Sequence, residues 1–134
     1  MEITKELIKI FADWTKLKIR IHASEKEIYF KEGQVWWASI GQNIGVESNG
    51  KNDSFERPII IFKRFNQDSF LGVMLSSNKR IGNYYLELKD DYEISSFANL
   101  SQIKLLSSKR LIRYVRDLPK SDLDTIKHKI KDYL

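Results

Sequence analysis

Residues 58–75 of this 134-residue chain read PIIIFKRFNQDSFLGVML. The first part, residues 58–64, opens with a proline at a position that a strand tolerates and continues with β-branched residues. That pattern is typical of a buried strand. Residues 65–69 turn the chain, and the apolar residues 70–75 are expected to form a second strand. Because only a short turn joins the two strands, we predict that they pair as a hairpin.

Further short strands lie on both sides of this hairpin. Residues 34–40 are rich in aromatic side chains and end at Gly41, and three more strands are predicted at residues 84–88, 100–106 and 112–116. Ser121 and Asp124 match a capping box and predict the start of a C-terminal helix. The sequence therefore predicts a mainly β fold, a small twisted or barrel-like antiparallel sheet with flanking helices.

The N-terminal segment has a helical pattern. Its apolar residues follow alternating steps of four and three, which places them on one face: Ile3, Leu7, Ile10, Trp14, Leu17 and Ile21. We expect this helix to dock on its own domain; the alternative is a helix that pairs with a partner or covers a site. A polar break at residues 25–27 follows, so we divide the chain into an N-terminal helical extension, residues 1–28, and a domain of residues 29–134.

Composition restricts the possible chemistry. The chain has no cysteine, which excludes disulfide scaffolds, zinc ribbons and thiol nucleophiles, and its two histidines, His22 and His128, are far apart in sequence. We therefore expect no metal and no cofactor. No apolar run approaches the ~20 residues that span a bilayer, so we expect no membrane association and a cytoplasmic location. The formal net charge of +5 suits a polyanionic partner.

Residues 41–55 form a long polar loop between two predicted strands. Three glycines and the run from Ser48 to Ser54 favour turns rather than packing. Irregular connections longer than ~12 residues are usually functional or disordered. The loop is therefore a candidate part of a functional site.

Several short motifs, in order, resemble the MazF/PemK family of toxin endoribonucleases. They are Gly33-Gln34-Val35-Trp36-Trp37, Ile40-Gly41, Gly45-Val46-Glu47, Arg57-Pro58, Leu75-Ser76-Ser77, Leu100-Ser101-Gln102-Ile103-Lys104 and Lys109-Arg110-Leu111. The resemblance runs from about Gly33 into the C-terminal helix. It implies an SH3-like barrel of the CcdB/PemK type that forms homodimers and cuts single-stranded RNA, such as mRNA, without metal. It also implies that a cognate antitoxin silences the protein.

Carried onto this chain, the family's catalytic arginine falls on Arg57 and its catalytic threonine on Ser76. A guanidinium presents a planar fork of donors to phosphate oxygens, whereas a serine keeps the hydroxyl of threonine without its stiff χ1. Four further residues are candidates for binding RNA or ordering the loop: Glu47, Phe55, Ser77 and Lys79. Of these, Phe55 suits stacking on a base, and Ser77 replaces Ser76 if the alignment is shifted by one.

The chain departs from the family pattern in three ways. Serine replaces threonine at Ser76, several residues are added between Glu47 and Arg57, and the helical extension precedes the barrel. Two other functions therefore stay open: a barrel that binds a protein target, as CcdB toxins bind DNA gyrase, and an inactive module that binds RNA or DNA. Five basic residues of the C-terminal third could supply a phosphate-binding face or a solvated one: Lys104, Lys109, Arg110, Arg113 and Arg116.

Overall fold

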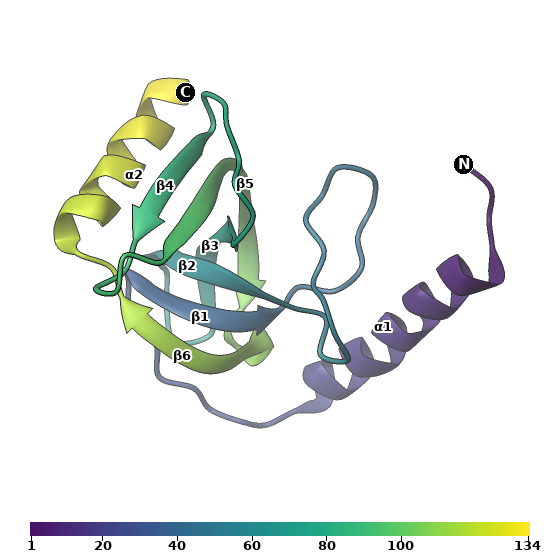
Figure 1. The fold of residues 1–134 in the computed structure, drawn as a ribbon. Coiled ribbons are helices and arrows are strands. Elements are labelled where there is room, and N and C mark those ends of the chain that lie inside the picture. The colour runs from purple at the N-terminus through teal and green to yellow at the C-terminus, as the bar shows by residue number, and fades with distance from the viewer.

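The computed structural model describes all 134 residues as a six-stranded antiparallel sheet with a helix at each end of the chain (Figure 1). The strands are β1 (Gln34–Ser39), β2 (Glu56–Arg64), β3 (Ser69–Ser76), β4 (Tyr85–Lys89), β5 (Ser95–Ser107) and β6 (Leu111–Asp117), with the 3₁₀ turn η1 (Ser108–Arg110) before β6. The helices are α1 (Lys5–Ala23) and α2 (Lys120–Tyr133). The mainly β fold with two flanking helices is thus confirmed.

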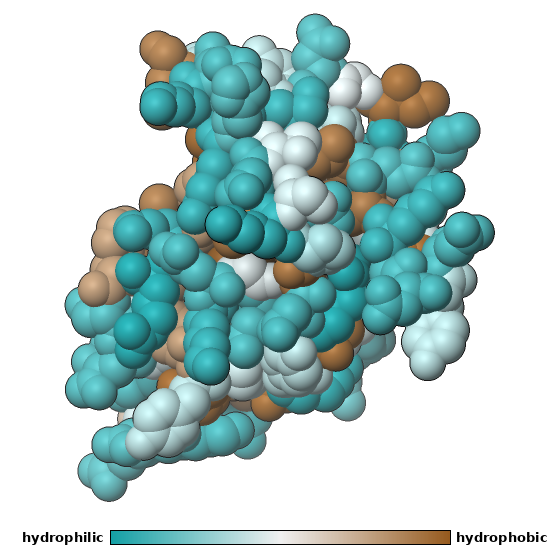
Figure 2. Space-filling model, turned by 90° about the vertical axis from the view of Figure 1, so that its left-hand side faces the viewer, coloured by the Kyte–Doolittle hydropathy of each residue, from teal (hydrophilic) through white to brown (hydrophobic).

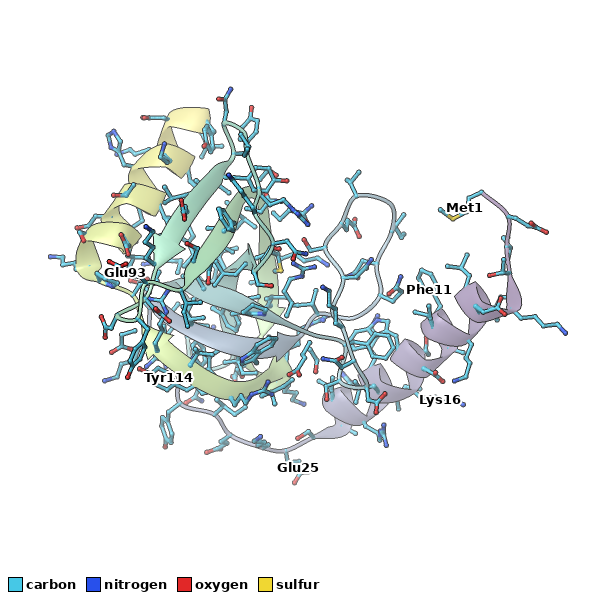
Figure 3. All side chains as sticks on the ribbon, in the orientation of Figure 1. Met1, Phe11, Lys16, Glu25, Glu93 and Tyr114 are labelled. Atoms are coloured by element: carbon cyan, nitrogen blue, oxygen red, sulfur yellow. The ribbon has the colours of Figure 1, made fainter.

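The sheet is strongly bent but open rather than a closed barrel. Its order is β4-β5-β3-β2-β1-β6, so β4 and β6 are the two edges. One end of β4 nevertheless comes close to β6. Residues 89–92, at the end of β4, and residues 114–117 of β6 line one cavity. Glu93 and Tyr114 mark this region in Figure 3. The predicted barrel is therefore incomplete, since no backbone ladder joins the two edges.

The β2–β3 hairpin at the middle of the sheet is buried on both faces. Ile59 and Ile61 pack into one cluster with Phe70 and Met74, whereas Ile60 points to the other face. That second cluster includes Ile126 and Ile130 of α2, which covers this side of the sheet. A strand with two buried faces needs apolar residues at every position. This explains the unbroken run that follows Pro58.

Helix α2 begins without the predicted capping box. Its N-cap residue is Pro119, no side chain caps the first turn, and Ser121 lies inside the helix. The proline's fixed φ, here −54°, directs the chain into the helix, and its carbonyl accepts the first backbone hydrogen bonds, from Asp122 and Leu123. The predicted cap at Ser121 was therefore wrong, whereas the predicted helix was right.

Helix α1 extends away from the sheet (Figure 1), and its buried side chain and its hydrogen bond to the domain lie in the C-terminal half. Thr4 caps its N-terminus by accepting from the Leu7 N–H at 3.1 Å. Trp14 is its one buried side chain, and Lys109 Nζ donates to the His22 carbonyl at 2.7 Å. The expected docking on its own domain is confirmed for this half.

The face of the molecule on the α2 side is mostly hydrophilic (Figure 2). Neither helix is long and apolar enough to cross a membrane.

Candidate functional site

Arg57 and Ser76 lie on neighbouring strands at the same level of the sheet. Ile59 of β2 pairs with Met74 of β3, and continuing this antiparallel register by two residues places Arg57 opposite Ser76. Directly opposed residues project their side chains from the same face. Both residues line the same cavity of about 610 Å³, which we call the large cavity, and both also line an adjoining small cavity of about 380 Å³. The two residues that the sequence singled out are thus brought together.

Backbone carbonyls hold the Arg57 guanidinium in place. Its Nε donates to the Asn49 carbonyl at 2.7 Å and its Nη1 to the Leu75 carbonyl at 3.0 Å. A guanidinium has five N–H donors, so these two bonds leave three for a substrate. Because both partners are neutral carbonyls, no carboxylate neutralises the charge.

Burial and a neighbouring charge act on Arg57 in the same direction. Burial lowers the pKa of the guanidinium below its ordinary value, and the positive charge of Arg80 lowers it further. An arginine remains protonated at neutral pH despite such a shift. A partly desolvated cation without a counterion attracts an anion more strongly than a solvated one does. The site is therefore suited to a phosphate group.

Ser76 ends strand β3 with its hydroxyl oriented by the following turn. Its Oγ accepts from the Asn78 N–H at 3.2 Å, which leaves the hydroxyl proton available for donation. Ser77 lines only the small cavity and Lys79 lines neither, although the Lys79 carbonyl accepts from Arg80 Nη1 at 3.3 Å. Arg80, which sequence reasoning passed over for Lys79, lines both cavities.

The long loop forms one wall of the large cavity through residues 46–51. Glu47 lies on this wall and its Oε1 accepts from the Ile44 N–H at 3.3 Å, a contact within the loop. Phe55 lines neither cavity; its ring packs against Trp14 of α1 with centroids 5.6 Å apart. Of the two predicted roles, binding RNA or ordering the loop, the contacts of Glu47 and Phe55 favour ordering the loop.

Gln102 fastens the loop to the sheet, a role that sequence reasoning missed. Its Oε1 accepts from the Ser48 N–H at 3.0 Å and its Nε2 donates to the Val46 carbonyl at 2.8 Å. Val73 pairs with Ile103 but Met74 with Asn99, so residues 100–102 bulge out of the β3–β5 ladder. This bulge aims Gln102 at the loop. The Leu-x-Gln-Ile motif at residues 100–103 was the available signal, but it did not reveal the partner.

The five C-terminal basic residues do not form one free phosphate-binding face. Arg110 is half-buried, and its Nη1 donates to the Ser39 and Ile40 carbonyls. Arg113 pairs with Glu56 at 2.8 Å, and Lys109 donates to α1. Arg116 lines the small cavity. The cations that both cavities share are Lys51, Arg57 and Arg80. No group of three His, Cys, Asp or Glu side chains is placed to hold a metal ion.

Solved structures with the same fold include toxins. MazF from Deinococcus radiodurans superposes with a TM-score of 0.63 at 13% identity, covering 80% of this chain and 97% of that one. An endoribonuclease from a mycobacterial species, in complex with its cognate antitoxin, gives 0.60 at 14% identity over 78% of this chain and 93% of that one. At such identities the likeness shows the fold alone. No protein of curated function matches the chain in sequence.

The sequence itself matches a family model over most of its length. The model describes the PemK-like, MazF-like toxins of type II toxin-antitoxin systems, and it matches residues 31–134. The match begins just before β1 and includes the whole sheet and α2, leaving out α1. With the sheet, the cleft and this match in agreement, the chain belongs to the PemK-like, MazF-like family of type II toxins.

Proposed function

We propose that this protein is the toxin of a toxin-antitoxin pair and acts as a metal-independent endoribonuclease on single-stranded RNA. The observation that carries the proposal is the meeting of Arg57 and Ser76 in one cleft, with three guanidinium donors unused. The structural neighbour from a mycobacterial species is itself an endoribonuclease bound to its antitoxin, which supports the same activity here.

The groups that line the large cavity are suited to a reaction in which the RNA's own 2′-hydroxyl is the nucleophile. The 2′-oxygen attacks the adjacent phosphorus, the bond to the 5′-oxygen breaks, and the products carry a 2′,3′-cyclic phosphate and a 5′-hydroxyl. The attacking hydroxyl loses a proton and the leaving oxygen gains one, so no net proton is consumed. Negative charge accumulates on the phosphorane between these steps, where Arg57 stabilises it and the Ser76 hydroxyl donates a hydrogen bond.

The partners follow from the family and the cleft. We propose that the substrate is mRNA in the cytoplasm, that two copies form a homodimer, and that a cognate antitoxin silences the toxin. The extended loop at residues 41–55 walls the large cavity, and we expect it to influence which bases are accepted.

A cleavage assay in the presence of EDTA tests the activity. The purified protein should cut single-stranded RNA and leave 2′,3′-cyclic phosphate ends. Arg57→Ala should lower the rate by at least about 10²-fold, because it removes a preorganised donor for the transition state. Arg20→Ala, which removes an exposed arginine of α1, serves as the matched control. A requirement for Mg²⁺, or unchanged cutting by a folded Arg57→Ala variant, would contradict the proposal.

A further inference from the structure

The helix that precedes the family domain contacts the base of the active-site loop. Trp14 is the only buried side chain of α1, with 6% of its surface exposed. Its indole lies directly on Gly41, where a Cβ would overlap the ring, and packs against Phe55. Gly41 and Phe55 are the two ends of the loop that follows β1 and precedes β2. One side chain of α1 therefore contacts both ends.

Hydrogen bonds join these two ends into a narrow neck. The Phe55 carbonyl accepts from the N–H groups of Ile40 and Gly41, at 2.8 and 3.1 Å. The Gly50 N–H donates to the Gly41 carbonyl at 2.8 Å, and a Cβ at Gly50 would overlap the Phe55 carbonyl. The backbone is so tightly packed here that a shift of Gly41 or Phe55 would move Gly50 with it.

The neck leads directly to the catalytic guanidinium. Asn49 precedes Gly50, and its carbonyl accepts the Nε–H of Arg57 at 2.7 Å. From the Trp14 indole to Arg57 there is therefore one continuous path of contacts, through Gly41, Gly50 and Asn49.

The neck also contains a strained residue. Phe55 has a φ of +47°, a backbone conformation that a bulky side chain rarely adopts and that persists where surrounding contacts hold it. The Trp14 ring holds Phe55 from one side. The indole is itself held by the guanidinium of Arg110, which lies 5.7 Å from the ring centroid and donates to the Ser39 and Ile40 carbonyls.

None of the α1 residues lines the large or the small cavity, so the helix does not cover the cleft. In Figure 3, Phe11 lies on the part of α1 that extends away from the sheet, and Met1 lies on the segment before the helix. We propose that Trp14 is a positioning residue: by clamping Gly41 and Phe55, it fixes the loop whose Asn49 carbonyl orients Arg57 for catalysis. This inference rests on the proposed endoribonuclease function.

Kinetics of Trp14 variants in the full-length protein test the inference. The substrate is a single-stranded RNA whose cleavage site has been mapped by its new 5′ ends. Trp14→Ala should lower kcat about 10-fold, since small displacements of a catalytic group cost up to about 10²-fold. Affinity for the same RNA carrying a 2′-deoxy sugar at the scissile position should change less than about two-fold, because the cleft itself remains. Trp14→Phe should restore most of kcat, and Ile19→Ala, at a 63% exposed residue of the same helix, should leave it unchanged.

The Nε–H resonance of Arg57 in an ¹⁵N NMR spectrum reports the position of the guanidinium without any reference to activity. We expect it to be protected from exchange in the wild type, Trp14→Phe and Ile19→Ala, and exposed in Trp14→Ala. Phe55→Leu removes the ring contact from the loop side. Like Trp14→Ala, it should expose the Nε–H and lower kcat. If Trp14→Ala does not fold, Phe55→Leu takes its place as the test: a protected Nε–H or an unchanged kcat in this variant would overturn the positioning role.

The outcomes separate the two proposals. If Arg57→Ala loses the expected factor of about 10² or more in rate but folded Trp14→Ala keeps both kcat and a protected Nε–H, the positioning role is overturned and the nuclease stands. If kcat falls in Trp14→Ala while the Nε–H stays protected, the effect does not pass through Arg57 and the inference is equally overturned. If folded Arg57→Ala cuts RNA at the wild-type rate, the proposed function fails, whatever the spectrum of the Trp14 variants shows.

Discussion

Ser76 is the residue at which this chain departs most directly from the family's catalytic pair. Its hydroxyl oxygen accepts from the Asn78 N–H, and this contact orients the side chain without the second substituent of a threonine. Serine therefore retains the hydroxyl donor of threonine, and we expect the replacement to change the rate of RNA cleavage rather than its mechanism.

Substitution at Ser76 tests that expectation. Ser76→Ala should lower kcat about 10- to 10²-fold, because the transition state loses one hydrogen bond. Ser76→Thr should match or exceed the wild type by a few-fold, because its β-branch restricts χ1. Single-turnover rates of RNA cleavage measure both. If Ser77→Ala loses rate and Ser76→Ala does not, then Ser77 rather than Ser76 supplies the hydroxyl.

The proposed catalytic pair could be singled out because the family resemblance falls on two short local motifs. Arg57 stands next to Pro58 at the start of an aliphatic strand, and Ser76 follows the last apolar residue of the next. Phe55 could not be placed in this way. Nothing in the polar loop indicates that its ring meets Trp14, more than 40 positions earlier in the chain.

At the scale of elements, the bulge in β5 connects the sheet to the loop that walls the large cavity. Residues 100–102 leave the ladder with β3, and Gln102 gains two hydrogen bonds to the loop, at Ser48 and Val46. The sequence predicted a strand over residues 100–106, whereas β5 begins at Ser95. Alternation of polar and apolar residues cannot reveal a bulge, because the irregularity is fixed by pairing with a strand elsewhere in the chain.

Removing the Gln102 side chain should loosen the loop while the sheet persists. Gln102→Ala breaks both hydrogen bonds, so we expect the free energy of unfolding to fall by about 1–2 kcal/mol. The Ser48 amide should exchange its hydrogen faster, whereas the Ile60 amide, in the middle of the sheet, should be protected nearly as before. Hydrogen exchange measured by NMR resolves the two sites, and Gln67→Ala, in the exposed β2–β3 turn, is the control. Unchanged exchange at Ser48 would show that other contacts hold the loop.

Across the whole molecule, one carboxylate joins the sheet to the C-terminal helix. Glu32 Oε1 accepts from the Arg64 N–H at 3.2 Å and lies 3.5 Å from Lys63 Nζ, while its Oε2 lies 3.6 Å from Lys127 Nζ of α2. The sequence showed both β2 and α2, but not that Glu32 would bridge them. Such a bridge depends on where the linker before β1 passes, and no periodic pattern records that path.

The Glu32 bridge should make stability depend on pH. Burial alone would raise the pKa of this carboxyl, but the Arg64 N–H, Lys127 and Lys63 together lower it below its ordinary 4.5. A lowered carboxyl pKa contributes stability that is fully present above the unfolded-state value and lost as pH falls through the folded-state value. Glu32→Gln should therefore be less stable than the wild type near pH 7, by under about 1 kcal/mol since the pair is partly solvated. Denaturant unfolding should show this gap closing toward about pH 3. Glu25→Gln, at an exposed glutamate outside any ion pair, is the control and should unfold with the same free energy as the wild type. If the difference between Glu32→Gln and the wild type is the same near pH 7 and in acid, packing rather than charge is its cause.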